Sequence, residues 1–423
     1  MAERMYEQKA KNTKEKLFTR NFTFLILGQI SSLIGNYTLR FALSMYVLEV
    51  TGSASVFAGL LALAMLPTIF LSPFGGILAD RANRRNIMVA LDTLSGLIVL
   101  IAGLTLKAGG PDIFIIAVLL VVLSVLSAFE SPTVQACIPQ MLSGDNMIKG
   151  NATVSQVSSI AGLITPFLGS LFYTAFGIQP VFMAAVAGFF VTAVLECFIH
   201  LDYKKSPRKG KIGSVIKEDL LVSIRFLHQK EPGILKLLLL AAMVSLFVAG
   251  TTVIGFPYLV RTVLGLSASF YGAAESALGI ASIFGSLFVA VFAKRLCMGY
   301  LAWIFMAFGL CLIPCGAVFI YPSGPLIRYA VLLAMFFASQ FGCSFFSTYA
   351  ISLIQERTPE NMMGKIMSYV FTLSMCAQPV GQIIYGALFD YFSRQVYWVL
   401  IPSGLIVVMI GLASRKFFIK GLG

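Results

Sequence analysis

A few polar and ionisable residues interrupt stretches that are otherwise apolar: Asn36, Arg40, Glu130 and Glu275. An ionisable side chain is costly inside a membrane, so such residues usually mark an ion or substrate pathway. A carboxyl group kept away from water can load and release a proton near neutral pH. Asn36 precedes Arg40 by four residues and would lie on the same helix face.

These residues allow one hypothesis with a specific chemistry. Glu275 would bind a proton or a cation, and Arg40 would pair with it when the outer end of a shared cavity closes. The simpler alternative is that both residues are structural anchors whose charged ends reach the membrane surface. For Glu130, the simple alternative is a solvated carboxylate. Both alternatives stay open at the level of sequence.

A second charged group lies in the short segment from Gly75 to Arg85, between apolar stretches at 54–79 and 86–106. Its ionisable members are Asp80, Arg81, Arg84 and Arg85. A connection this short joins two antiparallel membrane helices. Asp80 would lie at a helix C-terminus, where the helix dipole disfavours an acid, so we expect it to have a partner.

The small residues of this segment have separate expected roles. Gly75 and Gly76 should let another backbone come close to the helix. Asn83 lies in the turn, where asparagine tolerates a left-handed conformation. Two further acids, Asp92 and Glu196, lie near helix ends on the same side and are expected to pair with basic loop residues.

The composition of the chain indicates what must position these residues. The sequence has 423 residues, of which 58% are hydrophobic and 12% charged, and its mean hydropathy is +0.89. Soluble domains carry about 25% charged residues. The chain is therefore expected to be an all-α protein that crosses a membrane many times.

Each crossing needs about 20 predominantly apolar residues. The sequence predicts twelve such spans, at 21–48, 54–79, 86–106, 112–139, 151–174, 179–199, 234–258, 269–293, 299–321, 326–353, 366–389 and 396–414. These give a tail at 1–20, a first six-helix bundle at 21–199, a linker at 200–233, a second bundle at 234–414 and a tail at 415–423.

The basic residues predict the orientation of these spans. Most of the 31 lysines and arginines fall in segments on one side, whereas only Lys107, Arg261, Arg328 and Arg394 fall on the other. Such asymmetry places the basic side and both termini in the cytoplasm. The net charge of +13 then faces anionic lipid, and no nucleic acid is expected as a partner. The linker begins with a basic run and continues as an amphipathic helix on the inner leaflet.

The two halves of the chain resemble each other. The segment at 131–140, after the fourth span, is similar to 347–356, after the tenth. Pro166-Phe167-Leu168-Gly169 in the fifth span corresponds to Pro379-Val380-Gly381 in the eleventh. Duplicated halves of this kind are typical of transporters in which one half rocks against the other.

The segment from Gly76 to Arg85 resembles the signature loop of the major facilitator superfamily, Gly-x-Leu-Ala-Asp-Arg-x-Gly-Arg-Arg. Asn83 stands where that pattern has a glycine. The resemblance implies two six-helix bundles and an inner-gate role for the loop residues Gly76, Asp80, Arg81, Arg84 and Arg85. It also implies that Glu130 joins the Asp80 and Arg81 network.

Further motifs point to a branch of that superfamily. The segment Gly162-Leu163-Ile164-Thr165-Pro166-Phe167-Leu168-Gly169 looks like a shortened form of the motif in the fifth span of drug:proton antiporters. Gly162, Pro166 and Gly169 would bend that helix where the halves meet. The segments 48–54, 128–139 and 355–364 resemble the macrolide-efflux-type branch. Many drug:proton antiporters carry an arginine at the position of Leu123, so this chain departs from their usual arrangement for proton coupling.

The resemblance implies a secondary transporter that exports hydrophobic or amphiphilic drugs by alternating access, with the proton as the expected coupling ion. An uptake carrier or an exporter of siderophores or metabolites is the nearer alternative, and a non-transporting membrane receptor is the remoter one. The expected location is the bacterial cell membrane, and a monomer is expected.

Several other classes of protein are disfavoured. The sequence has no Gly-x4-Gly-Lys-Ser/Thr loop, so an ATP-driven pump or nucleotide enzyme is not expected. Seven scattered cysteines and two histidines form neither a disulfide framework nor a zinc pattern. No metal, no cofactor and no enzymatic activity are therefore expected.

Overall fold

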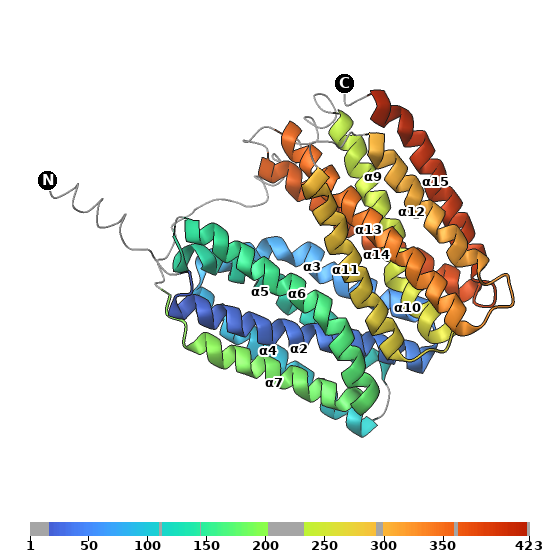
Figure 1. Ribbon diagram of the computed structural model, residues 1–423. Coiled ribbons are helices and arrows are strands. Elements are labelled where there is room, and N and C mark those ends of the chain that lie inside the picture. Colours follow the sequence, from blue (N-terminus) through green and yellow to red (C-terminus); the bar gives the residue numbers. More distant parts are fainter. Residues whose placement is uncertain are drawn as a thin grey trace.

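The computed structural model describes residues 17–109, 112–143, 145–201, 232–292, 299–358 and 363–420. These residues form helices without strands (Figure 1). The first half of the chain contains α2 (Arg20–Thr51), α3 (Ala54–Arg81), α4 (Arg84–Gly109), α5 (Ile113–Met141), α6 (Asp145–Phe176) and α7 (Ile178–Cys197). The second half contains α9 (Pro232–Val248), η1 (Ala249–Gly255), α10 (Phe256–Tyr258), η2 (Leu259–Val263), α11 (Ala268–Phe292), α12 (Gly299–Ala317), α13 (Pro325–Arg357), α14 (Met363–Tyr391) and α15 (Tyr397–Lys420).

Eleven helices of the described part are long and apolar enough to cross a membrane. They correspond to eleven of the twelve predicted spans. The remaining span, at 366–389, is α14, which is 29 residues long and carries polar residues such as Gln378 and Gln382 along its length. Large apolar side chains such as Phe70 and Phe114 are exposed on the outside of the molecule, as expected for helices that face lipid.

Local sequence signals set the ends of the first two helices. The Thr19 side chain accepts a hydrogen bond from the Phe22 N–H (3.3 Å) and caps α2. α2 ends at Gly52, whose φ of 61° suits glycine better than any residue with a Cβ. Ser53 then caps α3 by accepting a hydrogen bond from the Val56 N–H. The chain therefore reverses direction within two residues.

The two halves meet through helices in equivalent positions. The fifth helix of the first half, α6, packs against the second helix of the other half, α11, and α14 packs against α3 in the same way. This reciprocal pairing confirms the pseudo-symmetry predicted from the sequence. Figure 1 shows the halves converging at the end where α10 lies and diverging toward the end where α7 finishes and α9 begins. We call these the closed end and the linker end.

The seventh span is not a regular α-helix. After α9 the backbone forms two π-helical segments, η1 and η2, separated by α10. Gly250 and Gly255 lie against the rings of Tyr385 and Phe389 on α14, where a Cβ would come within 2.0 Å and 2.6 Å of ring atoms. These glycines allow the widened turns of this span to pack closely on α14.

The segment from Gly75 to Arg85 forms the predicted tight connection between α3 and α4, with two differences in detail. A Cβ at Gly75 would lie 2.4 Å from the Ala128 carbonyl oxygen, as expected for a close contact with α5, whereas nothing lies within 4 Å of such an atom at Gly76. The prediction that another backbone comes close to Gly76 is therefore wrong. No described residue other than glycine has a positive φ, so Asn83 is not left-handed. Its Oδ1 instead accepts a hydrogen bond from the Asn86 N–H (3.4 Å) at the start of α4.

Some predicted features lie outside the described residues. They are most of the N-terminal tail, the greater part of the linker with its expected amphipathic helix, and the last residues of the C-terminal tail. The described residues of both bundles provide the geometry of the candidate site.

Candidate functional site

Two adjoining cavities lie near the middle of the molecule. The larger has a volume of about 680 Å³ and is lined by α2, α5 and α6 of the first half, including Asn36, Arg40 and Glu130. The smaller, of about 320 Å³, is lined by both halves and includes Arg40 and Glu275. Tyr37 and Arg40 line both. The four polar residues selected from the sequence therefore lie around two neighbouring cavities.

Arg40 is held by neutral partners within its own half. Its Nε donates to Asn36 Oδ1 at 2.8 Å, and its Nη2 donates to Ser124 Oγ at 3.4 Å. The first bond confirms that Asn36 and Arg40 share one helix face. Both bonds fix the guanidinium in the cavity wall without neutralising its charge.

Glu275 lies in the facing wall, on α11, and one of its oxygens, Oε2, has no hydrogen-bond donor among the described residues. The hydroxyl of Tyr271, one turn away, is its close neighbour. The expected ion pair between Arg40 and Glu275 is not formed in this structure, although its closed end is shut. The Arg40 guanidinium binds Asn36 and Ser124 instead.

Aromatic rings separate this cavity from the closed end. Phe41 of α2 stacks on Tyr271 of α11, with ring centroids 5.5 Å apart and planes at 11°. Phe256 packs edge-on against Tyr271 and lies 4.8 Å from the ring of Phe336. Because Tyr271 precedes Glu275 by one turn, the rings lie between Glu275 and the closed end of α11.

Glu130 faces the larger cavity beside Gln29 and feels the charge of Arg40. The side chains of Asp80 and Arg81 lie outside the described part, so the network expected between them and Glu130 stays a prediction. The immediate electrostatic partner of Glu130 among the described residues is Arg40.

The arginines of the signature loop bind the ends of neighbouring helices. Arg84 donates from Nε to the Ala79 carbonyl (2.8 Å) on α3 and from Nη1 to the Ala136 carbonyl (2.6 Å) on α5. Arg85 donates to the Cys197 carbonyl at the end of α7. Cations are favourable at helix C-termini, where carbonyls lack partners. The loop therefore ties four helices of one half together at the linker end.

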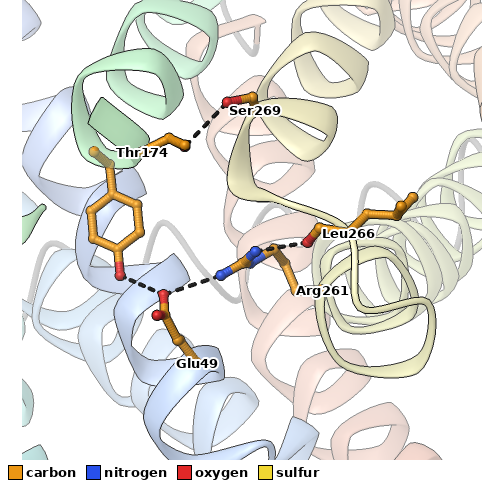
Figure 2. Close-up of polar contacts among 6 residues, drawn as sticks. Glu49, Thr174, Arg261, Leu266 and Ser269 are labelled. Carbon is orange, nitrogen blue, oxygen red and sulfur yellow. Dashed lines mark hydrogen bonds and ion pairs between the residues drawn. The ribbon is translucent and has the colours of Figure 1, made fainter. Parts of the chain in front are cut away.

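The closed end is held by an ion pair that the sequence did not identify. Arg261 Nη2 lies 3.1 Å from Glu49 Oε2, and the Tyr173 hydroxyl donates to the same carboxylate oxygen at 2.8 Å (Figure 2). Arg261 Nη1 also donates to the Leu266 carbonyl at 2.7 Å. The sequence assigned Arg261 no partner, because nothing in it links this arginine to Glu49, 212 positions away.

A second acid joins the halves at the closed end. Asp390 of α14 accepts hydrogen bonds from Ser53 Oγ (2.6 Å), the Ala54 N–H (2.7 Å) and the Ser55 N–H (2.9 Å). A carboxylate at a helix N-terminus is favoured by the unpaired N–H groups and the helix dipole. Asp390 therefore anchors α14 to the first turn of α3 in the other half.

The fifth-span motif lies where the halves meet, as expected, but its glycines are not the tightest contacts. Around Gly162 and Gly169, the nearest atoms to an added Cβ are 4.0 Å and 3.5 Å away. On the facing helix α11, a Cβ at Gly272 would lie 2.1 Å from Ser170 Oγ and 2.5 Å from the Pro166 carbonyl oxygen. Close packing of α6 on α11 therefore depends on Gly272.

The acids Asp92 and Glu196 do not pair with basic loop residues as expected. Both are almost completely buried, with exposed fractions of 0% and 1%. Asp92 Oδ1 accepts a hydrogen bond from Ser32 Oγ at 3.1 Å. The neighbouring bases Arg84 and Arg85 turn to backbone carbonyls instead.

The described residues contain no group of three or more histidine, cysteine or acidic residues that could hold a metal ion.

Comparisons with known proteins agree with this geometry. A sequence model described as Major Facilitator Superfamily matches residues 25–381. Macrolide efflux protein A of Streptococcus pyogenes is 25% identical over 407 residues, which cover 95% of each chain. An enterobactin exporter of Salmonella typhi is 24% identical over 322 residues, covering 74% of this chain and 72% of that protein.

A solved structure of a bacterial homologue of the human lysosomal transporter Spinster, in an inward-facing and unoccupied conformation, aligns with a TM-score of 0.70. It is 14% identical and covers 95% of this chain and 98% of that one. At this identity the likeness establishes the fold and leaves the cargo to the geometry of the site.

Proposed function

The chain belongs to the major facilitator superfamily, and from this premise we propose that it is a proton-coupled exporter of hydrophobic or amphiphilic molecules. As a multi-pass transporter of the cell membrane, it has two bundles that can move against each other. The observation that carries the proposal is the cavity that both halves line, which an ion pair, hydrogen bonds and aromatic rings separate from the closed end.

The lining of the smaller cavity supports a hydrophobic cargo. Its wall includes the large apolar and aromatic side chains of Phe41, Phe57, Leu61, Val253 and Tyr271. Arg40 and Glu275 are its charged members. Sites that bind varied drugs are largely apolar, with a few polar groups that fix orientation. An amphiphilic molecule can bury its apolar body among these rings and present a basic group to Glu275.

The direction of export follows from the proposed orientation. Basic residues are concentrated at the linker end, which places that end in the cytoplasm. The contacts of the closed end then shut the cavity toward the outside. An exporter in this state is ready to accept its cargo from the cell interior or the inner leaflet.

Glu275 is the proposed proton-binding group within the cargo cavity. Its Oε2 has no donor, so the carboxyl group can accept either a proton or the cationic end of a cargo. Competition between the two would couple proton entry to cargo release. Arg40 would supply the opposite charge on the facing wall.

The proposal is tested by measuring the accumulation of a panel of lipophilic dyes and macrolides in cells that express the protein, with and without a protonophore. Export is supported if expressing cells accumulate less of a compound than control cells and the protonophore removes this difference. Equal accumulation in expressing and control cells would refute it.

A second candidate is export of an anionic metabolite such as a siderophore. The observation in its favour is Arg40, whose charge in the cavity is not neutralised by its bonds to Asn36 and Ser124. Including an iron-free catecholate siderophore in the same panel separates the two candidates, because only the second predicts its export.

A further inference from the structure

Two buried acids that play no part in the cargo cavity lie together inside the first half. Asp92 of α4 and Glu196 of α7 are on helices that pack against each other. Both contact the same face of α2: Ser32 binds Asp92, and Gly28, one turn away, lies against the Glu196 side chain, where an added Cβ would be 3.9 Å from Cγ. The two side chains therefore lie where α2, α4 and α7 pack together.

These carboxyl groups lack the donors that two buried anions would need. Asp92 Oδ2 and both oxygens of Glu196 have no hydrogen-bond donor among the described residues. The two side chains nevertheless lie close enough to interact with each other. Two ionised carboxylates can only accept, so an attractive contact between them requires a proton on one of them.

Apart from two arginines of α4, the groups around the pair are acidic or neutral. On α5, Glu130 adds negative charge and Cys137 is a buried thiol. On α7, Cys197 is the adjacent titratable group, and Glu196 lies at the helix C-terminus, where the dipole disfavours an anion. The side chains that α2 brings to the pair, Gln29 and Ser32, are neutral.

The neighbouring bases are on α4 itself. Arg84 donates to the carbonyls of Ala79 and Ala136, and Arg85 donates to that of Cys197. Arg85 Nε has no hydrogen-bond partner among the described residues. A proton therefore remains the group that best satisfies the facing carboxyl oxygens.

A polar route joins the pair to the large cavity. Ser32 lines that cavity and donates its hydroxyl hydrogen to Asp92. Its oxygen can accept a proton from cavity water while its own hydrogen passes to the carboxylate. Gln29 and Glu130 line the same wall beside it. Water in the cavity is therefore one hydroxyl group away from the buried acids.

We propose that Asp92 and Glu196 form a proton-binding site, an acid pair that holds one proton between α4 and α7 and exchanges it with the cavity through Ser32. Binding forms one O–H bond on a carboxylate oxygen, and the proton comes from water or hydronium in the cavity. Loss of that proton leaves two facing anions, whose repulsion would separate α4 from α7. The site itself is independent of the cargo, whereas its use in coupling rests on the proposed transport function.

The existence of the site is tested by infrared spectroscopy of the purified full-length protein at neutral pH, which detects the carbonyl band of protonated carboxylic acids. Asp92→Asn should remove the intensity of one carboxyl group, because the new amide donates to Glu196 without a proton. Glu196→Gln should remove the same intensity, and the double variant no more than either single one. Asp112→Asn, at an exposed helix cap, is the matched control and should leave the band unchanged.

Unchanged bands in both single variants would overturn the proposal. A double variant that loses twice the intensity of a single variant would also overturn it, because each acid would then carry its own proton. Ser32→Ala preserves the pair and tests the route without removing a carboxyl group. The band should remain at full intensity, but its shift after transfer to heavy water should become several-fold slower. An unchanged exchange rate would refute exchange through Ser32.

Coupling is tested separately in proteoliposomes with a lipophilic cation and an imposed pH gradient. Asp92→Asn should lose stimulation by the gradient and keep transport down the cargo gradient. Full stimulation in this variant would show that the pair is not used for coupling. Absence of any cargo movement by the wild-type protein, with its infrared band intact, would count against the proposed function and leave the proton site standing.

Discussion

Arg261 Nη2 and Glu49 Oε2 lie 3.1 Å apart and join the two halves of the protein at its closed end. The Tyr173 hydroxyl binds the same carboxylate oxygen, so α2, α6 and η2 meet at one atom (Figure 2). Ser269 and Thr174 form a second contact between the halves nearby, at 3.1 Å. Opening of the closed end would break these contacts.

Arg261→Ala is expected to shift the protein toward the state that is open at this end. The Glu49 side chain is 55% exposed, and exposed ion pairs contribute about 0.2–1 kcal/mol, so the closed population should fall by up to about fivefold. Alkylation of a cysteine introduced at Thr174, with exposed Cys197 and Cys376 replaced by serine, should accelerate accordingly. Lys107→Ala, an exposed base at the same end, is the control. Equal rates in both variants would show that the ion pair does not hold this end shut.

Gly272→Ala is expected to weaken the contact between α6 and α11. Its methyl group would lie 2.1 Å from Ser170 Oγ and 2.5 Å from the Pro166 carbonyl oxygen, which cannot move without the backbone. Overpacking of this kind costs about 1–3 kcal/mol. The same alkylation assay should therefore show a larger opening than Arg261→Ala produces. Gly59→Ala, with nothing within 4 Å, should behave like the wild type.

Glu275→Gln is expected to change how transport depends on pH. Glutamine cannot bind or release a proton, so transport of a cationic drug should lose its dependence on external pH. Initial rates in everted vesicles across a range of pH values measure this effect. Glu356→Gln removes an exposed acid outside the cavity and serves as the control. A pH profile that Glu275→Gln leaves unchanged would exclude this residue from proton coupling.

Arg84→Lys and Asp80→Asn are expected to slow the transport cycle without preventing membrane insertion. Arg84 binds the Ala79 and Ala136 carbonyls through two different nitrogens, and the single ammonium of lysine cannot reproduce that fork. Turnover in proteoliposomes should fall several-fold at equal protein content. Lys149→Ala, at an exposed position, should retain full turnover. Wild-type turnover in both loop variants would refute the proposed role of the loop in gating.

The sequence predicted the architecture well because hydropathy and charge asymmetry act over whole helices. Eleven of its twelve spans meet the length and apolarity of a membrane crossing, and the duplicated halves are confirmed. The details of the signature loop were harder to predict. Asn83 caps a helix instead of adopting a left-handed turn, because its side chain can reach the Asn86 N–H.

The sequence selected residues that line the cavities, but it did not predict which residues they bind. Arg40 and Glu275 share a cavity, yet neutral residues that have no distinctive sequence pattern hold Arg40. Asp92 and Glu196 looked like surface acids because nothing in the sequence shows that α4 and α7 turn them toward each other. Asp390 and Arg261 bind residues more than 200 positions away, and only the folded chain brings such partners together.

The π-helical segments of the seventh span suggest how the ion pair at the closed end could be broken. A π turn contains one residue more than an α turn, so relaxing η2 to α geometry would twist the chain beyond it by about 100°. Arg261 lies within η2 and would be carried away from Glu49 by that twist. Rewinding a single turn would thus break the ion pair between Arg261 and Glu49 without unfolding the helix that carries Arg261.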